Sequence, residues 1–142
     1  MEIVFYDGIN NTPAMDIALE AWNDIRNTGM SDNTITLHFE QKAFLAMGNS
    51  NFPIGIILVE RFDYMKMVQI RIGWVTPAHR RTGVYRKLFD AVVDKAREWG
   101  AVEIIGVTRP QNHRMRAVAR SMGREEVGVV LRYVVVKKEK KE

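Results

Sequence analysis

The sequence predicts an α+β (mixed α/β) fold of three layers, in which helices cover a central mixed, mostly antiparallel sheet. In the first half of the chain, apolar runs of strand length follow one another through short turns, which implies antiparallel pairing. In the second half, helical patterns separate the runs, which implies crossover connections. The length of 142 residues indicates one domain, and a domain of that size buries roughly 70% of its unfolded surface.

The chain begins with a predicted strand and a predicted helix. Residues Glu2–Tyr6 form a short apolar run that an Asp-Gly pair closes. Thr12 is a suitable N-cap, and Pro13 suits the first helical position, where no N–H is needed. The helix is expected to end at Gly29. Its apolar residues recur at helical spacing, and they are Met15, Ala18, Leu19, Trp22 and Ile25.

Three strands joined by short turns are expected next, at residues 43–47, 53–62 and 67–75. Residues 31–41, which precede them, fit a helix or a strand. Strict alternation along the third strand puts alternate side chains on opposite faces. One face carries Val68, Ile70, Ile72 and Trp74, and the other carries Gln69, Arg71, Gly73 and Val75.

Helices and strands alternate in the second half. The pattern predicts a helix at 84–99, a strand at 102–108, a helix at 111–122 and a last strand at 127–136. Gly100 and Gly123 suit the positions that end the two helices. The last run is apolar on both faces, which is typical of a central strand. We therefore expect a single domain over residues 1–136 and a solvated charged tail at 137–142.

Composition restricts the classes of function. The net charge of +4 and the isoelectric point of about 9.5 favour anionic ligands. The absence of cysteine excludes disulfides, thiolate catalysis and zinc–thiolate sites. The three histidines lack metal-ligand spacing, so no metal site is predicted. The first twenty residues show no secretory signal, and no apolar run approaches the ~20 residues that span a bilayer, so a cytoplasmic protein without a membrane segment is expected.

The stretch His79–Val92 places one glycine between basic residues and an amphipathic helical pattern. The first amides of a helix lack intrahelical partners and lie at the positive end of the helix dipole. Gly83 removes a Cβ at that point, and Arg80 and Arg81 add positive charge, so this turn can hold a diphosphate. An ordinary strand-to-helix turn with solvated arginines explains the same residues equally well.

Two longer runs resemble the GCN5-related N-acetyltransferase (GNAT) family. The run V-T-P-A-H-R-R-T-G-V-Y, Val75 to Tyr85, is followed by R-K-L-F. It is similar to the family's acyl-CoA signature, Arg/Gln-x-x-Gly-x-Gly/Ala after a Val-x-Pro strand end. The run N-H-R-M-R-A-V-A-R-S-M-G, Asn112 to Gly123, resembles the family's asparagine-led helix that ends in glycine. The order of strands and helices also matches the family over nearly the whole chain.

The resemblance implies an acetyl-CoA-dependent N-acyltransferase that acetylates a primary amine. Val75 and its strand backbone would hold the pantetheine arm and the thioester carbonyl, and Asn112 would bind the cysteamine end. Gly73 and Trp74 lie where the family's strand splays from its neighbour to open the acyl slot. Backbone amides of six residues would wrap the pyrophosphate, and these residues are Arg80, Arg81, Thr82, Gly83, Val84 and Tyr85.

Three residues depart from the family pattern. Tyr85 stands at the last loop position, which is usually glycine or alanine. Ala119, seven residues after Asn112, stands where many members carry a tyrosine that acts as general acid. Gln69 occupies the strand position at which some members place a glutamate as base, and an amide cannot usefully accept a proton.

The nearest substitute for that base is Glu60 on the preceding strand. If a short turn joins the two strands, Glu60 lies opposite Gln69, and opposed residues point to the same face. That face is predicted to carry Gly73 and Val75, so Glu60 becomes the candidate catalytic base. A solvent-facing glutamate beside a neighbouring arginine is the alternative, and a slip of one residue in register would turn the side chain away.

Three functions fit these residues to different degrees. Acetyl transfer to an amine of a small molecule or a protein is the leading hypothesis. The three departures favour the second, a GNAT-like domain that binds CoA or a protein partner without turnover. The third hypothesis is a basic nucleic-acid-binding module, but nucleic acid is not expected as a partner, because the arginines scatter and no binding motif is present. A homodimer is left open. Carboxylates on the first helix could attract the amine or form a solvated face, and these are Asp16, Glu20 and Asp24.

Overall fold

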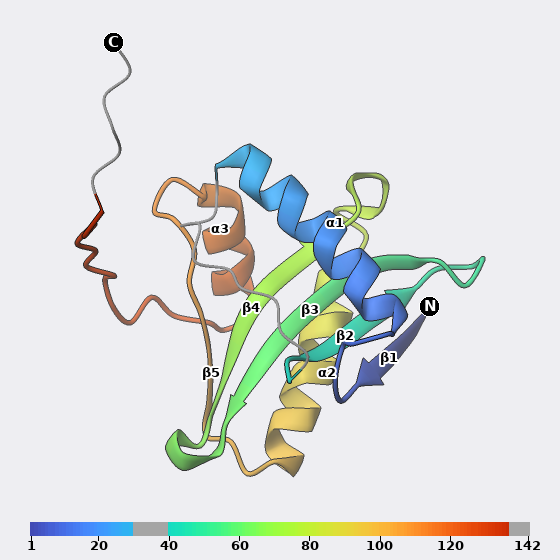
Figure 1. Ribbon diagram of the computed structural model, residues 1–142, viewed down its shortest axis with the longest axis horizontal. Helices are drawn as coiled ribbons and strands as arrows, with labels where there is room; N and C mark the ends of the chain where they lie inside the picture. The colour runs from blue at the N-terminus through green and yellow to red at the C-terminus, as the bar shows by residue number, and fades with distance from the viewer. Residues whose placement is uncertain (30–39, 137–142) are drawn as a thin grey trace.

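The computed structural model describes residues 1–29 and 40–136, so most of the ambiguous segment 31–41 and the whole tail 137–142 lie outside the described residues. A five-stranded sheet has the order β1-β2-β3-β4-β5, in which β5 is parallel to β4 and the other pairs are antiparallel (Figure 1). The predicted mixed, mostly antiparallel sheet is therefore confirmed. Its strands are β1 (Glu2–Tyr6), β2 (Lys42–Met47), β3 (Pro53–Phe62), β4 (Met67–Val75) and β5 (Glu103–Gly106).

Helices cover both faces of the sheet, which gives the predicted three layers. Helix α1 (Pro13–Thr28) packs on one face and helix α2 (Val84–Glu98) on the other, each over its own cluster of buried side chains. Helix α3 (His113–Ser121) follows β5. No helix in residues 1–29 or 40–136 is long and apolar enough to cross a membrane.

Helix α1 begins and ends where the sequence predicts. The hydroxyl oxygen of Thr12 accepts a hydrogen bond from the amide of Ala14 at 3.2 Å, and Pro13 occupies the first helical position. Gly29 ends the helix at φ 71°, and its N–H donates to the carbonyl of Arg26. Local capping chemistry therefore determines both ends of the helix.

A β-bulge at Arg71 corrects the predicted faces of β4. Ile70 pairs with Val59 and Ile72 pairs with Leu58, so Arg71 has no opposite residue on β3. An extra residue reverses the alternation beyond it. Before the bulge, Val68 and Ile70 face α2. After it, Ile72 and Trp74 face α1, whereas Gly73 and Val75 face α2.

Strands β4 and β5 run together over only part of their length. Their pairing covers Met67–Ile70 and Glu103–Gly106. The remainder of β4, residues 71–75, has no strand on that edge in the described chain, because β5 ends at Gly106 and not at the predicted residue 108. The sheet therefore opens between the two strands, toward the C-terminal end of β4.

The predicted central strand at residues 127–136 is wrong for this chain. The segment forms no strand, and eight of its ten side chains are large, apolar and exposed. Their exposed fractions run from 53% at Val134 to 91% at Leu131. The apolar pattern was read correctly, but a central strand needs neighbours on both edges, and no strand of the described chain adjoins this segment.

We expect Leu88→Ala to lower the free energy of unfolding by about 2–5 kcal/mol, because the Leu88 side chain is fully buried between α2 and the sheet. Urea unfolding followed by circular dichroism measures this loss. Leu19→Ala on α1 is the matched control, since Leu19 is 43% exposed and should cost far less. Equal losses in the two variants would contradict this account of the core.

Candidate functional site

The turn between β4 and α2 adopts two left-handed backbone conformations. The 3₁₀ turn Pro77–His79 follows β4, and the amide of His79 donates to the carbonyl of Thr76 at 2.9 Å. Arg81 then has φ 64° and Gly83 has φ 83°. Arg81 is a non-glycine residue in a region that L residues rarely adopt. Gly83 is the N-cap of α2 and offers no side chain to cap it.

This backbone leaves a group of amides available at the start of α2. In the described chain, no backbone carbonyl accepts from the N–H groups of residues 81–86, and the first helical bond runs from Lys87 to Gly83 at 3.2 Å. No heavy atom beyond the two chain neighbours lies within 4 Å of a Cβ built on Gly83. Unpartnered amides and the positive end of a helix dipole together form a site that favours phosphate groups.

Arg80 braces the turn from the side of α1. Its Nε donates to the carbonyl oxygen of Val75 at 2.9 Å, and its Nη2 donates to Asp24 Oδ2 at 3.1 Å. The indole N–H of Trp74 donates to the same carboxylate oxygen at 2.8 Å. Asp24 therefore holds α1, the end of β4 and the turn together. Sequence reasoning considered Asp24 only as a charge on a helix face and missed this role.

Tyr85 turns toward the sheet and lies beside the opening between β4 and β5. A Cβ on Gly73 would lie 2.8 Å from the Tyr85 ring, so only glycine fits there without movement. Arg124 donates to the phenol oxygen at 3.2 Å and also lies against Gly106 and the Phe89 ring. Burial raises the pKa of the Tyr85 phenol, although Arg124 acts in the opposite direction. Arg124 was not singled out from the sequence.

Glu60 lies opposite Gln69, as the predicted turn required. The bulge at Arg71 nevertheless corrects its predicted face: Glu60 points to the side of α1, whereas Gly73 and Val75 point to the side of α2. Six residues of strand separate Gln69 from Val75, which is about 20 Å at 3.3 Å per residue. Glu60 therefore lies far from the turn that precedes α2.

The Glu60 carboxylate is held by two neighbours on the α1 face. Its Oε1 accepts from Arg71 Nε at 3.0 Å and from Gln41 Nε2 at 3.0 Å. Gln41 is fully buried and Glu60 is 14% exposed at its side chain. These hydrogen bonds hold the Glu60 carboxylate in one orientation.

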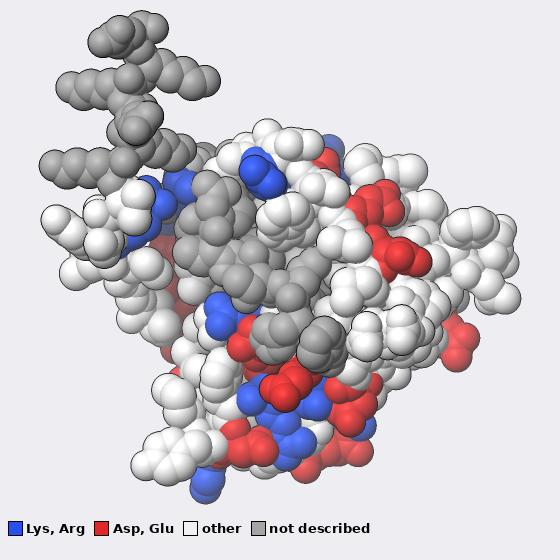
Figure 2. Space-filling model, viewed as in Figure 1, with Lys and Arg blue, Asp and Glu red and all other residues white. Residues whose placement is uncertain are grey.

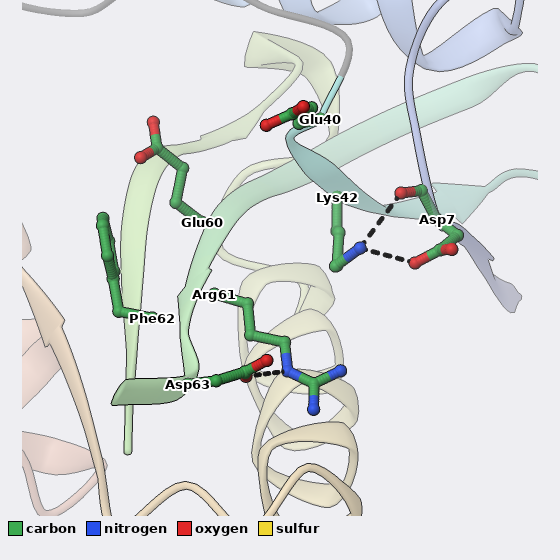
Figure 3. A pocket seen from close by; sticks show the side chains of 7 residues that line it. All are labelled: Asp7, Glu40, Lys42, Glu60, Arg61, Phe62 and Asp63. Atoms are coloured by element: carbon green, nitrogen blue, oxygen red, sulfur yellow. Dashed lines mark hydrogen bonds and ion pairs between the residues drawn. The ribbon is translucent and has the colours of Figure 1, made fainter. Parts of the chain in front are cut away.

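A hollow of about 610 Å³ lies beside Glu60 at this end of the sheet. Figure 3 shows Glu60 and Arg61 pointing to opposite sides of β3, and Figure 2 shows acidic and basic side chains crowded together at the lower end of the face in view. Lys42 Nζ lies 2.6 Å from Asp7 Oδ1, and Arg61 pairs with Asp63. The lining has four carboxylates and two cations, and its members are Asp7, Glu40, Lys42, Glu60, Arg61, Phe62 and Asp63.

Asn112 lies at the start of α3, where its side chain makes two hydrogen bonds. Its Oδ1 accepts from the amide of Met115 at 3.2 Å, and its Nδ2 donates to Thr108 Oγ1 at 2.8 Å. The structure therefore gives Asn112 a capping role. In the part of the chain that the structure describes, no three potential metal ligands come together.

Two features define the class of this α+β domain. The parallel strands β4 and β5 separate toward the end of β4, and the glycine-containing turn that follows β4 can bind phosphate. The profile of the acetyltransferase (GNAT) family matches residues 12–123. The chain therefore belongs to the GNAT acetyltransferase family, as its motifs predicted, and its reaction is acetyl transfer from acetyl-CoA to an amine. No curated protein matches the sequence.

Solved structures share this fold. Aminoglycoside N-acetyltransferase AAC(6')-Iy in complex with CoA is 24% identical, with a TM-score of 0.67 over 96% of this chain and 100% of that one. Aminoglycoside acetyltransferase meta-AAC0020 from an uncultured soil metagenomic sample, in complex with sisomicin, is 18% identical, with a TM-score of 0.72 over 96% of each chain. A putative acetyl transferase from Pyrococcus furiosus is 16% identical, with a TM-score of 0.65 over 94% of this chain and 100% of that one. At these identities the likeness establishes the fold.

The raised pKa of Tyr85 predicts a loss of stability at alkaline pH. A phenol that holds its proton more tightly when folded stabilises the protein below its ordinary pKa of about 10, and this contribution disappears as pH rises through the folded value. A tenfold difference in proton affinity corresponds to about 1.4 kcal/mol. We therefore expect the free energy of unfolding to fall more steeply above pH ~10 in the wild type than in Tyr85→Phe.

Urea titrations at a series of alkaline pH values measure these slopes. Tyr64→Phe is the matched control, because Tyr64 is fully exposed in the turn between β3 and β4. Parallel slopes for wild type and Tyr85→Phe would show that the phenol is not shielded by the fold.

Proposed function

We propose that the protein seats the diphosphate of acetyl-CoA on the amides of residues 81–85 and lays the acyl arm along the open edge of β4. One observation carries the proposal: unpartnered amides at the start of α2 adjoin the place where β5 leaves β4. The diphosphate and the thioester lie at opposite ends of the pantetheine arm. A phosphate site at the start of α2, next to an open strand edge on β4, therefore matches the two ends of acetyl-CoA.

Six residues of the turn contribute to this site in different ways. The backbone amides of Arg81, Thr82, Gly83, Val84 and Tyr85 supply the donors. Arg80 instead acts through Val75 and Asp24, because its guanidinium is already engaged with both. In this proposal Arg80 therefore positions the turn, and the exposed Arg81 supplies the charge.

Val75 and Asn112 contact the arm in the proposal. Within the described residues, the β4 backbone from Arg71 to Val75 has no neighbouring strand on the open edge and can hydrogen-bond to the amides of the arm. Asn112 keeps its Oδ1 on the amide of Met115, so only its Nδ2, now on Thr108, is able to turn to the cofactor. In this proposal, a contact of the arm with the β4 backbone or with Asn112 Nδ2 places the thioester between β4 and β5.

The transfer itself needs alignment and two proton movements. The amine nitrogen attacks the carbonyl carbon, the carbonyl oxygen gains negative charge near the β4 backbone, and the carbon–sulfur bond then breaks. Holding both reactants in one slot supplies much of the acceleration, and backbone N–H groups stabilise the oxyanion. Ala119 cannot protonate the leaving thiolate, so solvent supplies that proton in this proposal.

Glu60 is the proposed base for the attacking amine. It lies on the α1 face with a fixed orientation, beside a hollow whose carboxylates outnumber its cations. Such a lining attracts an ammonium ion, and a base has only to remove one proton from it, directly or through water. The acceptor would therefore approach from the α1 face, and acetyl-CoA from the start of α2.

One observation favours the second candidate, a GNAT domain that binds CoA or a protein partner without turnover. The Tyr85 ring and the Arg124 guanidinium occupy the α2 side of the opening beside Gly73 and Gly106. If both side chains stay there, the arm binds on the outer edge and the thioester does not reach the acceptor side. Release of free thiol from acetyl-CoA in the presence of a broad amine panel separates the two candidates, because only the enzyme gives it.

The proposal extends to partners and compartment. Acetyl-CoA and an amine, from a small molecule or a protein, are the partners, and nucleic acid is not among them. The cytoplasm is the proposed compartment, since acetyl-CoA is supplied there.

We expect acetyl-CoA to raise the melting temperature of the wild type and to do so much less for Gly83→Ala. Ligand at 100 times its dissociation constant stabilises by about 2.7 kcal/mol. A Cβ at Gly83 would stand where the diphosphate approaches the amides. Gly100→Ala is the matched control, because Gly100 also has a positive φ, 74° against 83°, and open space around it, but lies at the other end of α2.

Differential scanning fluorimetry with millimolar acetyl-CoA measures both effects. Gly83→Ala and Gly100→Ala should lose similar stability without ligand, since each puts a side chain into a left-handed conformation. The absence of any ligand shift in the wild type would overturn the cofactor proposal. Equal ligand shifts in the two variants would remove the turn from the binding site.

We expect Glu60→Gln to reduce kcat/KM for the amine about 10²- to 10⁴-fold, the usual contribution of a positioned base, with little change in KM for acetyl-CoA. Glutamine keeps an oxygen for Arg71 and Gln41, so the fold should persist. Steady-state kinetics by thiol release measure both constants. Asp63→Asn, in the same hollow, is the control and should retain activity. An unchanged rate in Glu60→Gln would exclude Glu60 as the base.

A further inference from the structure

Two side chains span the α2 side of the opening between β4 and β5. Tyr85, in the first turn of α2, lies against Gly73 of β4, where an added Cβ would come within 2.8 Å of its ring. Arg124 lies against Gly106 of β5, where an added Cβ would come within 2.7 Å of its Nη2. Arg124 Nη1 donates to the Tyr85 phenol oxygen at 3.2 Å. These two side chains, hereafter the bridge, therefore connect the two strands.

A glycine at each end gives the bridge its room. Gly73 and Gly106 do not have a positive φ, so the conformational freedom of glycine does not explain either of them. What both positions lack is space for a side chain. Glycine within a strand often marks a site where another group approaches closely. Alanine at either position would push the bridge away from the sheet.

The bridge is anchored on its own domain. The Arg124 amide donates to the carbonyl of Ala119 at 3.0 Å, and the Arg124 guanidinium carbon lies 5.2 Å from the centre of the Phe89 ring. Tyr85 packs against the cluster of apolar side chains between α2 and the sheet, which includes the fully buried Leu88. The bridge therefore separates the opening from the apolar core on the α2 side.

We propose that the bridge limits the length of the acyl chain that the enzyme accepts, so that Tyr85 and Arg124 determine its specificity for the acyl donor. The inference rests on the proposed function, in which the arm of acetyl-CoA runs from the turn along the open edge of β4. The acyl group is the leading end of that arm and lies between Gly73 and Gly106. The acceptor amine approaches from the α1 face, so the bridge lies on the other side of the acyl group.

A longer acyl chain meets an obstacle in each direction. Toward the α1 face it lies in the path of the amine. Further along the sheet the strands close, where Gly106 pairs with Ile70. Toward α2 it meets the Tyr85 ring and the charged guanidinium of Arg124, and covering a charge with methylene groups costs free energy of desolvation. Acetyl has only one methyl group beyond its carbonyl, so it avoids all three obstacles.

Isothermal titration calorimetry with acetyl-CoA and hexanoyl-CoA tests the proposal without an acceptor amine. We expect the wild type to bind hexanoyl-CoA at least tenfold more weakly, since even one methylene group changes selectivity about tenfold or more in an enzyme pocket. Tyr85→Ala keeps the backbone amide but opens the apolar core behind the ring, where each buried CH₂ favours binding. The tenfold difference should therefore disappear. Arg124→Ala is the second variant and should reduce the difference, because it removes the charge beside Gly106.

Tyr64→Ala and Arg97→Ala are the matched controls and should keep the wild-type ratio of affinities. Tyr64 is fully exposed in the turn between β3 and β4, and the Arg97 side chain on α2 is 77% exposed. Equal affinities of the wild type for the two compounds, or a ratio that both bridge variants leave unchanged, would overturn the length limit alone. Failure of the wild type to bind either compound would instead overturn the proposed function, and the length limit with it.

Discussion

In the described residues, strand β4 has hydrogen-bonding partner strands on both edges for its first four residues only, and the site depends on this limit. Beyond Ile70 it keeps β3 on one side and loses β5 on the other. Buried backbone groups without partners are costly, so a strand edge opened in this way requires water or a ligand. An extended molecule with its own amides, such as a pantetheine arm, satisfies these groups as a strand would. The same opening lies directly before the turn with its unpartnered amides.

Two carboxylates on the α1 face fix the ends of this open length of β4. At the far end, Asp24 accepts from Trp74 and from Arg80, which in turn holds the carbonyl of Val75. At the near end, Glu60 accepts from Arg71, the residue of the bulge. Each carboxylate therefore anchors a residue next to the opening to another element. Partly exposed pairs of this kind add little to global stability, so their main effect is to hold the strand in place.

Most strands and helices were predictable because their causes are local. The cap at Thr12, the proline after it and the glycine turn at Gly83 all act within a few residues, and the structure has each helix within two residues of the predicted bounds. The bulge at Arg71 was not predictable, because the alternation of apolar residues with other residues continues through it without a break. It reversed the expected face of Glu60.

The parts of the site that escaped prediction depend on distant contacts. Asp24 meets Trp74 and Arg80 at separations of 50 and 56 residues, and Arg124 meets Tyr85 at 39. In the sequence, Asp24 and Arg124 have the character of surface charges, since nothing nearby indicates a partner for either. The contrast with Glu60 and Gln69 is instructive, because a short turn between adjacent strands limits the choice of register and their pairing could be worked out by counting.

Residues 127–136 show which structural features an apolar sequence pattern determines and which it does not. Alternating and continuous apolar residues determine that residues 127–136 need cover on both faces, and this is a property of the segment alone. Which edge supplies that cover depends on where the chain before it is held, and here Glu126 on Arg116 holds it along α3. The ion pair therefore fixes where residues 127–136 start, whereas their apolar pattern alone does not determine which surface covers them.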